Sequence, residues 1–212
     1  MLVLGHVGFT LAAALLLDNS LPQNRFIIRQ EIVEKAASNT RIPALKGPSA
    51  KFWTLVKRTK GLDLRFVIVG SLLPDIIDKP IGQYFFRDTF GDGRLYCHTL
   101  LFVLVIALAG FLTSAIYERS YILLLAFGSL VHLILDFEWL DPRVLFWPLF
   151  GITFEKGHSP PFWEWLRGLV LEVFKVPWVA IPELVGAIIT IWFVWLLWHQ
   201  RKLGTFIIKG QA

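Results

Sequence analysis

Long runs of apolar residues constrain this chain more than any other feature of its sequence. The run from 99 to 117 contains no charged side chain, and a second one follows almost at once, from 121 to 137. Because a helix rises 1.5 Å per residue, about 20 such residues cross a hydrocarbon core of about 30 Å. With 55% of its 212 residues hydrophobic and only 17% charged, a water-soluble domain could not bury so many apolar side chains. The sequence therefore predicts an all-α integral membrane protein.

Five segments are expected to cross the membrane within a single domain over residues 1–212. They span residues 2–17, 66–77, 99–117, 121–137 and 179–198. No Lys or Arg precedes the first segment, as a signal peptide would require, so we expect a retained helix with its N-terminus outside. The second segment is short and contains Pro74; it is included because only then do the His and Asp residues meet on one membrane face. Residues 138–165 are expected to form a surface loop and residues 166–175 an interfacial helix.

Basic residues set the expected orientation of these segments. Residues 18–61 form a basic loop, expected to carry an interfacial amphipathic helix, and Arg201, Lys202 and Lys209 follow the last segment. Lys and Arg favour the cytoplasmic side of a membrane, so the loop and the C-terminus are predicted to be cytoplasmic. The sequence therefore predicts a multi-pass protein of the cell membrane, inner or plasma. The same residues account for most of the net charge of +5, so no nucleic-acid partner is expected.

Histidine and aspartate residues gather where the predicted segments reach the outer face. Ionisable groups near hydrocarbon are costly and so indicate functional sites. Because the chain has one cysteine, Cys97, a zinc site built from thiolates is excluded. Imidazoles with carboxylates predict one to three divalent cations, zinc in the first place, with manganese or iron as alternatives. The candidate metal ligands are His6, Asp75, Asp78, His98, His132, Asp136, Asp141 and His158.

Each of these patterns also has a simpler interpretation. His132 and Asp136 share one helical face four residues apart, and they suit either a metal or a hydrogen bond that joins helices. Asp75 and Asp78 follow Pro74, where two carboxylates could bridge metals or where Asp75 could only cap a helix. His6 has glycine neighbours and could be a packing residue. The histidines that could be no more than solvated side chains are His98 and His158.

Four motifs in a fixed order resemble the LexA-binding, inner-membrane-associated metal-dependent hydrolase family over most of residues 1 to 150. They are His6 in a short first helix, Leu73-Pro74-Asp75-Ile76-Ile77-Asp78, Arg94-Leu95-Tyr96-Cys97-His98-Thr99, and His132-Leu133-Ile134-Leu135-Asp136 before Asp141-Pro142. The resemblance implies a membrane-bound hydrolase whose metal is held by these His and Asp residues. The same order is also similar to the zinc-dependent phospholipase C and nuclease group, which implies a phosphoester substrate.

Hydrolysis at such a site needs a proton acceptor and a group that binds phosphate. An aspartate not fully used as a ligand, Asp75 or Asp78, is the expected catalytic acceptor of a proton from water. Arg94 and Arg143 are expected to bind a substrate phosphate, and tryptophans near the site favour a lipid or lipid-linked head group as substrate. Two other classes of function fit the same residues: a transporter or ion pathway, and a membrane scaffold without enzymatic activity.

Overall fold

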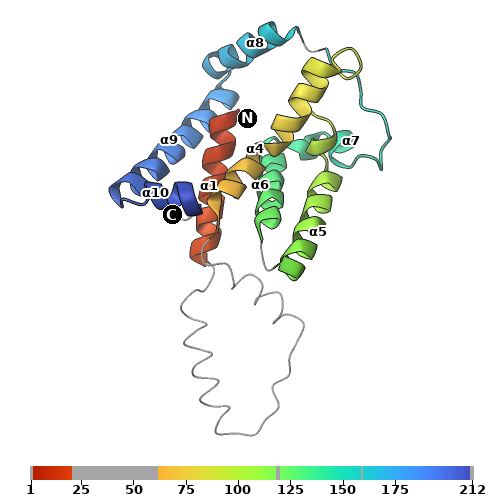
Figure 1. The fold of residues 1–212 in the computed structure, drawn as a ribbon. Coiled ribbons are helices and arrows are strands. Elements are labelled where there is room, and N and C mark those ends of the chain that lie inside the picture. The colour runs from red at the N-terminus through yellow and green to blue at the C-terminus, as the bar shows by residue number, and fades with distance from the viewer. Residues whose placement is uncertain (1, 21–61, 118–119, 159, 211–212) are drawn as a thin grey trace.

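The computed structural model describes residues 2–20, 62–117, 120–158 and 160–210. Within these ranges every regular element is helical (Figure 1), so the predicted all-α class is confirmed. The longer helices are α1 (Val3–Ser20), α4 (Leu64–Pro80), α5 (Leu100–Tyr117), α6 (Tyr121–Leu135), α8 (Phe162–Lys175) and α9 (Pro177–His199). The short elements are the π-helix η1 (Ile81–Phe85), the 3-10 turns η2 (Tyr96–His98) and η3 (Glu138–Leu140), and the helices α7 (Pro142–Leu145) and α10 (Leu203–Lys209).

The five predicted membrane segments each correspond to a helix, but only two of these helices are long and apolar enough to cross a membrane by themselves. These are α5, with 18 residues, and α9, with 23 residues. Helices α1 and α6 are apolar but shorter, while α4 carries two aspartates and two prolines. Five crossings therefore remain a prediction. The amphipathic helix expected within residues 18–61 lies, from residue 21 onward, outside the described residues.

Helix α4 contains Pro74 in its interior, and its neighbour α6 compensates for the proline. A proline has no N–H to give to the carbonyl four residues earlier, which here belongs to Gly70. The Ser129 hydroxyl on α6 donates to the Gly70 carbonyl at 3.0 Å. Helices of membrane proteins tolerate proline where a neighbour satisfies the freed backbone group in this way. The proline thus ties α4 to α6.

Close helix contacts are made through glycine. A Cβ on Gly8 of α1 would meet the backbone of Gly186 on α9, and a Cβ on Gly128 of α6 would meet the Val67 carbonyl on α4. Small residues let helix backbones approach within a membrane, where dispersion contacts replace the hydrophobic effect as the driving force. Buried apolar side chains from α1, α4, α6 and α9 form the hydrophobic core.

Helices α1, α4, α5, α6 and α9 run alternately down and up in Figure 1, and α8 lies across the end of the bundle where α9 begins. Glu183, near the start of α9, accepts hydrogen bonds from the backbone N–H groups of Leu2 and Gly5 at 2.5 and 3.1 Å. At the opposite end, the Leu64 N–H donates to the Gly210 carbonyl at 2.9 Å, which holds the chain after α10 against the start of α4. The helix expected over residues 166–175 is present as α8.

Candidate metal centre

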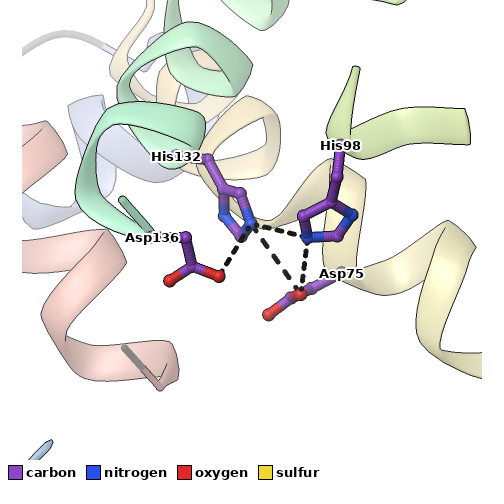
Figure 2. A group of neighbouring side chains, drawn as sticks. All are labelled: Asp75, His98, His132 and Asp136. Atoms are coloured by element: carbon purple, nitrogen blue, oxygen red, sulfur yellow. Dashed lines mark hydrogen bonds and ion pairs between the residues drawn. The ribbon is translucent and has the colours of Figure 1, made fainter. Parts of the chain in front are cut away.

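Four side chains from separate parts of the fold converge near the end of the bundle where α1 and α9 begin (Figure 2). They are Asp75 from α4, His98 from η2, His132 from α6 and Asp136 directly after α6, and one donor atom of each lies within 4.8 Å of the others. The two imidazole Nε2 atoms are 3.3 Å apart. Asp75 Oδ1 lies 3.4 Å from Nε2 of His98, and Asp136 Oδ2 lies 3.8 Å from Nε2 of His132.

Each imidazole is held by its other ring nitrogen. Nδ1 of His98 lies 2.8 Å from Asp78 Oδ2, and Nδ1 of His132 lies 2.7 Å from the Ser71 carbonyl oxygen. Because a carboxylate and a carbonyl can only accept, the proton of each neutral ring belongs on Nδ1. Both Nε2 lone pairs then point toward each other. Metal-bound histidines have outer partners of this kind, which set the tautomer and the ring orientation.

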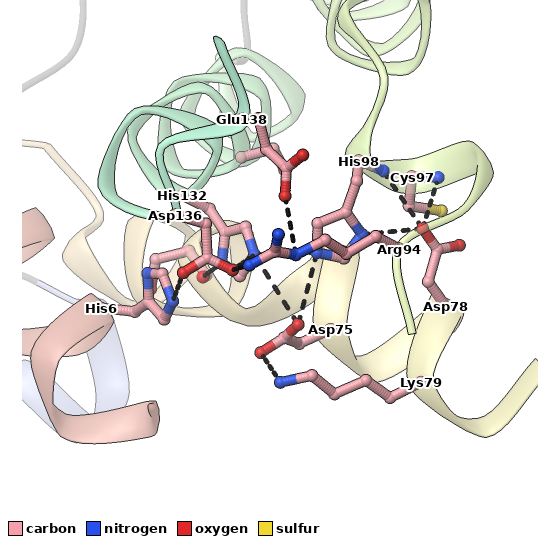
Figure 3. A network of polar contacts seen from close by, with 12 residues as sticks. His6, Asp75, Asp78, Lys79, Arg94, Cys97, His98, His132, Asp136 and Glu138 are labelled. Carbon is pink, nitrogen blue, oxygen red and sulfur yellow. Dashed lines mark hydrogen bonds and ion pairs between the residues drawn. The ribbon is translucent and has the colours of Figure 1, made fainter. Parts of the chain in front are cut away.

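The two carboxylates are held in the same way (Figure 3). Lys79 Nζ lies 2.5 Å from Asp75 Oδ2, and Nε2 of His6 lies 3.0 Å from Asp136 Oδ1. The His6 ring also stacks on the His132 ring, with centroids 4.1 Å apart. Asp75 Oδ1 is buried and has no hydrogen-bond partner among the described residues. Each carboxylate therefore turns one oxygen to an outer partner and the other toward the imidazoles.

The donor set fits a divalent cation. Neutral imidazoles and carboxylates without a proton between them repel one another, and this repulsion disappears when a cation lies among them. Around a tetrahedral zinc with bonds of about 2.1 Å, ligand atoms are about 3.4 Å apart. The separations of 3.3 and 3.4 Å match that value, whereas Nε2 of His132 lies 3.8 Å from both Asp75 Oδ1 and Asp136 Oδ2. Zinc, manganese and iron all accept this mixture of nitrogen and oxygen.

The pKa values of His98, in the cluster, and of Glu138, beside it, are both raised. Burial by itself would lower the pKa of His98, but the contacts with Asp75 and Asp78 outweigh it and raise the pKa to about 9. Without a cation, His98 is therefore protonated at neutral pH, and its positive charge lies beside the carboxylates of Asp75 and Asp78. Burial raises the pKa of Glu138 to about 7, although the nearby Arg94 opposes this shift.

Asp78 has a different role from the predicted one of ligand and catalytic acceptor. Its Oδ2 atom accepts from the backbone N–H groups of Leu95, Cys97 and His98 at 2.9 to 3.1 Å, besides contacting the His98 ring. Asp78 lies one turn further along α4 than Asp75, about 4.5 Å in axial rise, and is level with the turn at η2. It therefore holds the His98 ring in place and is not one of the four residues whose donor atoms converge.

Three other predicted residues are not brought into the cluster. Asp141 is exposed and caps α7, with Oδ1 accepting from the Val144 N–H at 3.4 Å. His158 is exposed in the segment between α7 and α8. Arg143 is exposed and forms an ion pair with Glu155. Position near a helix end suggested these residues, but an aspartate before a proline is also a common way to start a helix.

Arg94, which the sequence predicts to bind a substrate phosphate, lies next to the cluster. Its Nη2 atom lies 3.8 Å from Asp136 Oδ2 and its Nε atom 3.0 Å from Glu138 Oε1, while 46% of the side chain is exposed. The sequence analysis missed Glu138, Lys79 and Ser71. The position of Lys79, four residues after Asp75, could have revealed their ion pair. Ser71 acts through its backbone carbonyl, for which no side-chain pattern gives a signal.

A cavity of about 440 Å³ borders the cluster at Asp75. Its other lining residues come from the end of α4, from η1 and from α8, and they are Lys79, Pro80, Gln83, Tyr84 and Trp165. Asp75 belongs both to the cluster and to the cavity wall. A molecule in the cavity would therefore contact the residues that could hold a cation.

A family model described as YdjM inner membrane protein matches residues 1–206, which include every residue of the cluster. Neither the curated proteins nor the solved structures contain a match to the chain.

Proposed function

For this chain, which belongs to the YdjM inner membrane protein family, we propose that the cluster binds a divalent cation, most consistent with zinc. We also propose that the protein is a membrane-bound metal-dependent hydrolase. Its proposed substrate is a phosphoester in a lipid or lipid-linked head group. The proposal rests first on the chemistry of Asp75, His98, His132 and Asp136, and then on the cavity beside them.

The observation that carries the proposal is that each of the four cluster residues is also bound by a residue outside the cluster. Ser71, Asp78, Lys79 and His6 each engage one atom of a cluster residue, so the remaining donor atoms converge. Residues that only join helices could satisfy one another directly, without an outer partner for each of the four side chains. This arrangement of outer partners is expected for a metal site and is not needed for a scaffold.

The residues around the cluster fit phosphoester hydrolysis. A bound divalent cation would acidify water and offset phosphate charge. Arg94 reaches the cluster with a half-exposed guanidinium, whose planar donors suit two oxygens of a phosphate. Asp75 is the carboxylate that both faces the cluster and lines the cavity, so we propose its Oδ2 as the acceptor of a proton from the attacking water.

The proposed topology puts this chemistry on the extracytoplasmic face. Arg201 and Lys202 follow the end of α9 that lies away from the cluster, and such residues favour the cytoplasm. Helix α8 lies at the cluster end of the bundle (Figure 1) and exposes Trp163 and Phe174. Apolar rings at the membrane surface would bring the cluster to the depth of lipid head groups.

Turnover by purified, zinc-loaded protein tests the proposed activity. We expect hydrolysis of bis-p-nitrophenyl phosphate, and of phospholipids in detergent micelles, that a chelator abolishes and added zinc restores. His98→Ala should remove this activity, whereas His199→Ala, an exposed histidine on α9, should not. A protein that binds zinc through His98 but turns over no phosphoester would refute the hydrolase. A folded protein that binds no metal would favour the scaffold alternative.

A further inference from the structure

A buried glutamate lies beside the cluster without being one of its four residues. Glu138 is in η3, two residues after Asp136, and its side chain is only 1% exposed. Neither of its carboxylate oxygens has a hydrogen-bond partner among the described residues, but Oε1 forms an ion pair with Nε of Arg94 at 3.0 Å (Figure 3). Burying a carboxylate is costly, and a buried ion pair often adds nothing to stability. The pair of Glu138 and Arg94 therefore indicates a function.

The backbone fixes both partners of this ion pair. Phe137 adopts a left-handed conformation, with φ 58° and ψ 35°, and is exposed, whereas Glu138 directly after it is buried. A residue other than glycine is strained in this conformation, and such strain is found mostly at functional sites. On the other side of the pair, the backbone N–H of Arg94 donates to Asp92 Oδ1 at 3.1 Å. The ion pair then decides where the side chain of Arg94 lies.

Arg94 has a second carboxylate within reach. Its Nη2 atom lies 3.8 Å from Asp136 Oδ2, about 1 Å longer than a direct hydrogen bond between charged groups. The same Oδ2 atom lies 3.8 Å from Nε2 of His132, and so it is the oxygen of Asp136 that faces the cluster. The other oxygen, Oδ1, contacts His6. A guanidinium bound directly to Oδ2 would compete with a cation for this oxygen.

The charges around the ion pair show where Arg94 would move without Glu138. The charged groups that act on the Glu138 carboxylate are Arg94, His98, Asp136 and Asp141. Asp141 caps α7 at the surface, and Asp136 is the one other carboxylate that contacts the Arg94 guanidinium among the described residues. Arg94 is half-exposed, so its side chain has room to turn. Without Glu138, its nearest counter-charge is therefore Asp136.

From this geometry we infer that Glu138 is a positioning residue for Arg94. It holds the guanidinium through Nε, so that the guanidinium lies beside Asp136 Oδ2 and does not cover it, and a cation can bind this oxygen. Arg94 then stays next to the cation, where the proposed function needs a group that binds phosphate. The inference rests on the proposed function, because it concerns a cation in the same cluster.

The zinc affinities of four full-length proteins test this role. They are the unsubstituted protein, Glu138→Gln, Arg94→Gln and the double variant, each titrated in metal-free form with zinc against a chromophoric chelator. The titrations are made at pH 8, above the pKa of about 7 of Glu138. We expect Glu138→Gln to weaken zinc binding about tenfold while Arg94 is present, as does the loss of other outer partners of a metal site. In the Arg94→Gln protein the same substitution should change the affinity by less than about twofold, because no guanidinium remains to cover Asp136.

Two further variants separate position from charge. Glu138→Asp keeps the buried charge but withdraws the carboxylate from Arg94 by one methylene, about 1.5 Å. It should weaken zinc binding severalfold while Arg94 is present and not in the Arg94→Gln protein, and it replaces the glutamine variant if that variant does not fold. The control is Glu155→Gln, which removes the carboxylate from an exposed ion pair with Arg143 and should leave zinc affinity unchanged.

The outcomes separate this inference from the proposed function. Equal losses of zinc affinity with and without Arg94 would mean that Glu138 acts on the cation through its own charge, and would overturn the inference alone. Unchanged zinc affinity in a folded Glu138→Gln protein would do the same. An unsubstituted protein that binds no zinc would overturn the proposed function and the inference with it.

Discussion

Replacing Asp78 with asparagine tests whether this residue holds His98 or a cation. Asp78 Oδ2 accepts from three backbone N–H groups and contacts the His98 ring. Asparagine keeps an acceptor oxygen but loses the charge, and a hydrogen bond to a charged group exceeds a neutral one by about 1 kcal/mol. Across these contacts we expect the free energy of unfolding to fall by about 4 kcal/mol, less than the 5 to 15 kcal/mol of a typical domain.

The same substitution should weaken metal binding without abolishing it. Loss of an outer partner of a metal-bound histidine reduces metal affinity by about 10- to 100-fold, which corresponds to about 1.4 to 2.8 kcal/mol. Titration of metal-free protein with zinc against a chromophoric chelator measures this affinity, and unfolding in denaturing detergent measures stability. The stoichiometry at excess zinc should stay that of the unsubstituted protein.

The control for this experiment is Asp141→Asn. Asp141 caps α7 at the surface, and asparagine is an equally good cap, so neither stability nor zinc affinity should change. A folded Asp78→Asn protein with unchanged zinc affinity would refute the orienting role. Complete loss of binding at excess zinc would instead make Asp78 a ligand.

His132→Ala and Asp136→Ala should each abolish metal binding and hydrolysis, and the double variant should be hardly worse, because both residues serve one coordination sphere. His199→Ala is the control. Normal turnover by a folded Asp136→Ala protein would contradict the assignment. The pKa of His98 near 9 in metal-free protein means that zinc displaces a proton, so zinc affinity should rise about tenfold per pH unit up to about pH 9 and then level off. Calorimetric titrations that show no change between about pH 6 and 8 would oppose this. A cysteine at Lys46, in the loop predicted to be cytoplasmic, should resist an impermeant reagent in intact cells, and labelling there would reverse the topology.

The sequence was sufficient to predict the helical class and most of the cluster. Apolar runs predict the helices because only a helix satisfies its own backbone in hydrocarbon. Asp75, His98, His132 and Asp136 were all predicted because ionisable groups at the ends of apolar helices are costly unless they have a function. The i,i+4 spacing of the last two also predicted that they lie together, and His132 Nε2 is 3.8 Å from Asp136 Oδ2.

The sequence could not predict which side chains turn a donor atom into the cluster and which are outer partners that contact a cluster residue. Asp75 and Asp78 look equivalent, and only the position of the turn at η2 makes Asp78 an outer partner of His98. The role of the Ser71 carbonyl depends on how α6 packs on α4. Asp141 has the same composition signal as the four cluster residues, but Pro142 starts a surface helix beside it. Such differences are set by tertiary packing and not by local pattern.

Metal analysis of purified protein, combined with X-ray absorption at the zinc edge, tests the central claim most directly. The cluster predicts about one equivalent of a bound divalent cation, with a first shell that contains the imidazoles of His98 and His132, carboxylate oxygen and no sulfur. His98→Ala should lose this metal. Less than about a tenth of an equivalent of any transition metal in folded protein, or a spectrum with the Cys97 thiolate as a ligand, would contradict the account.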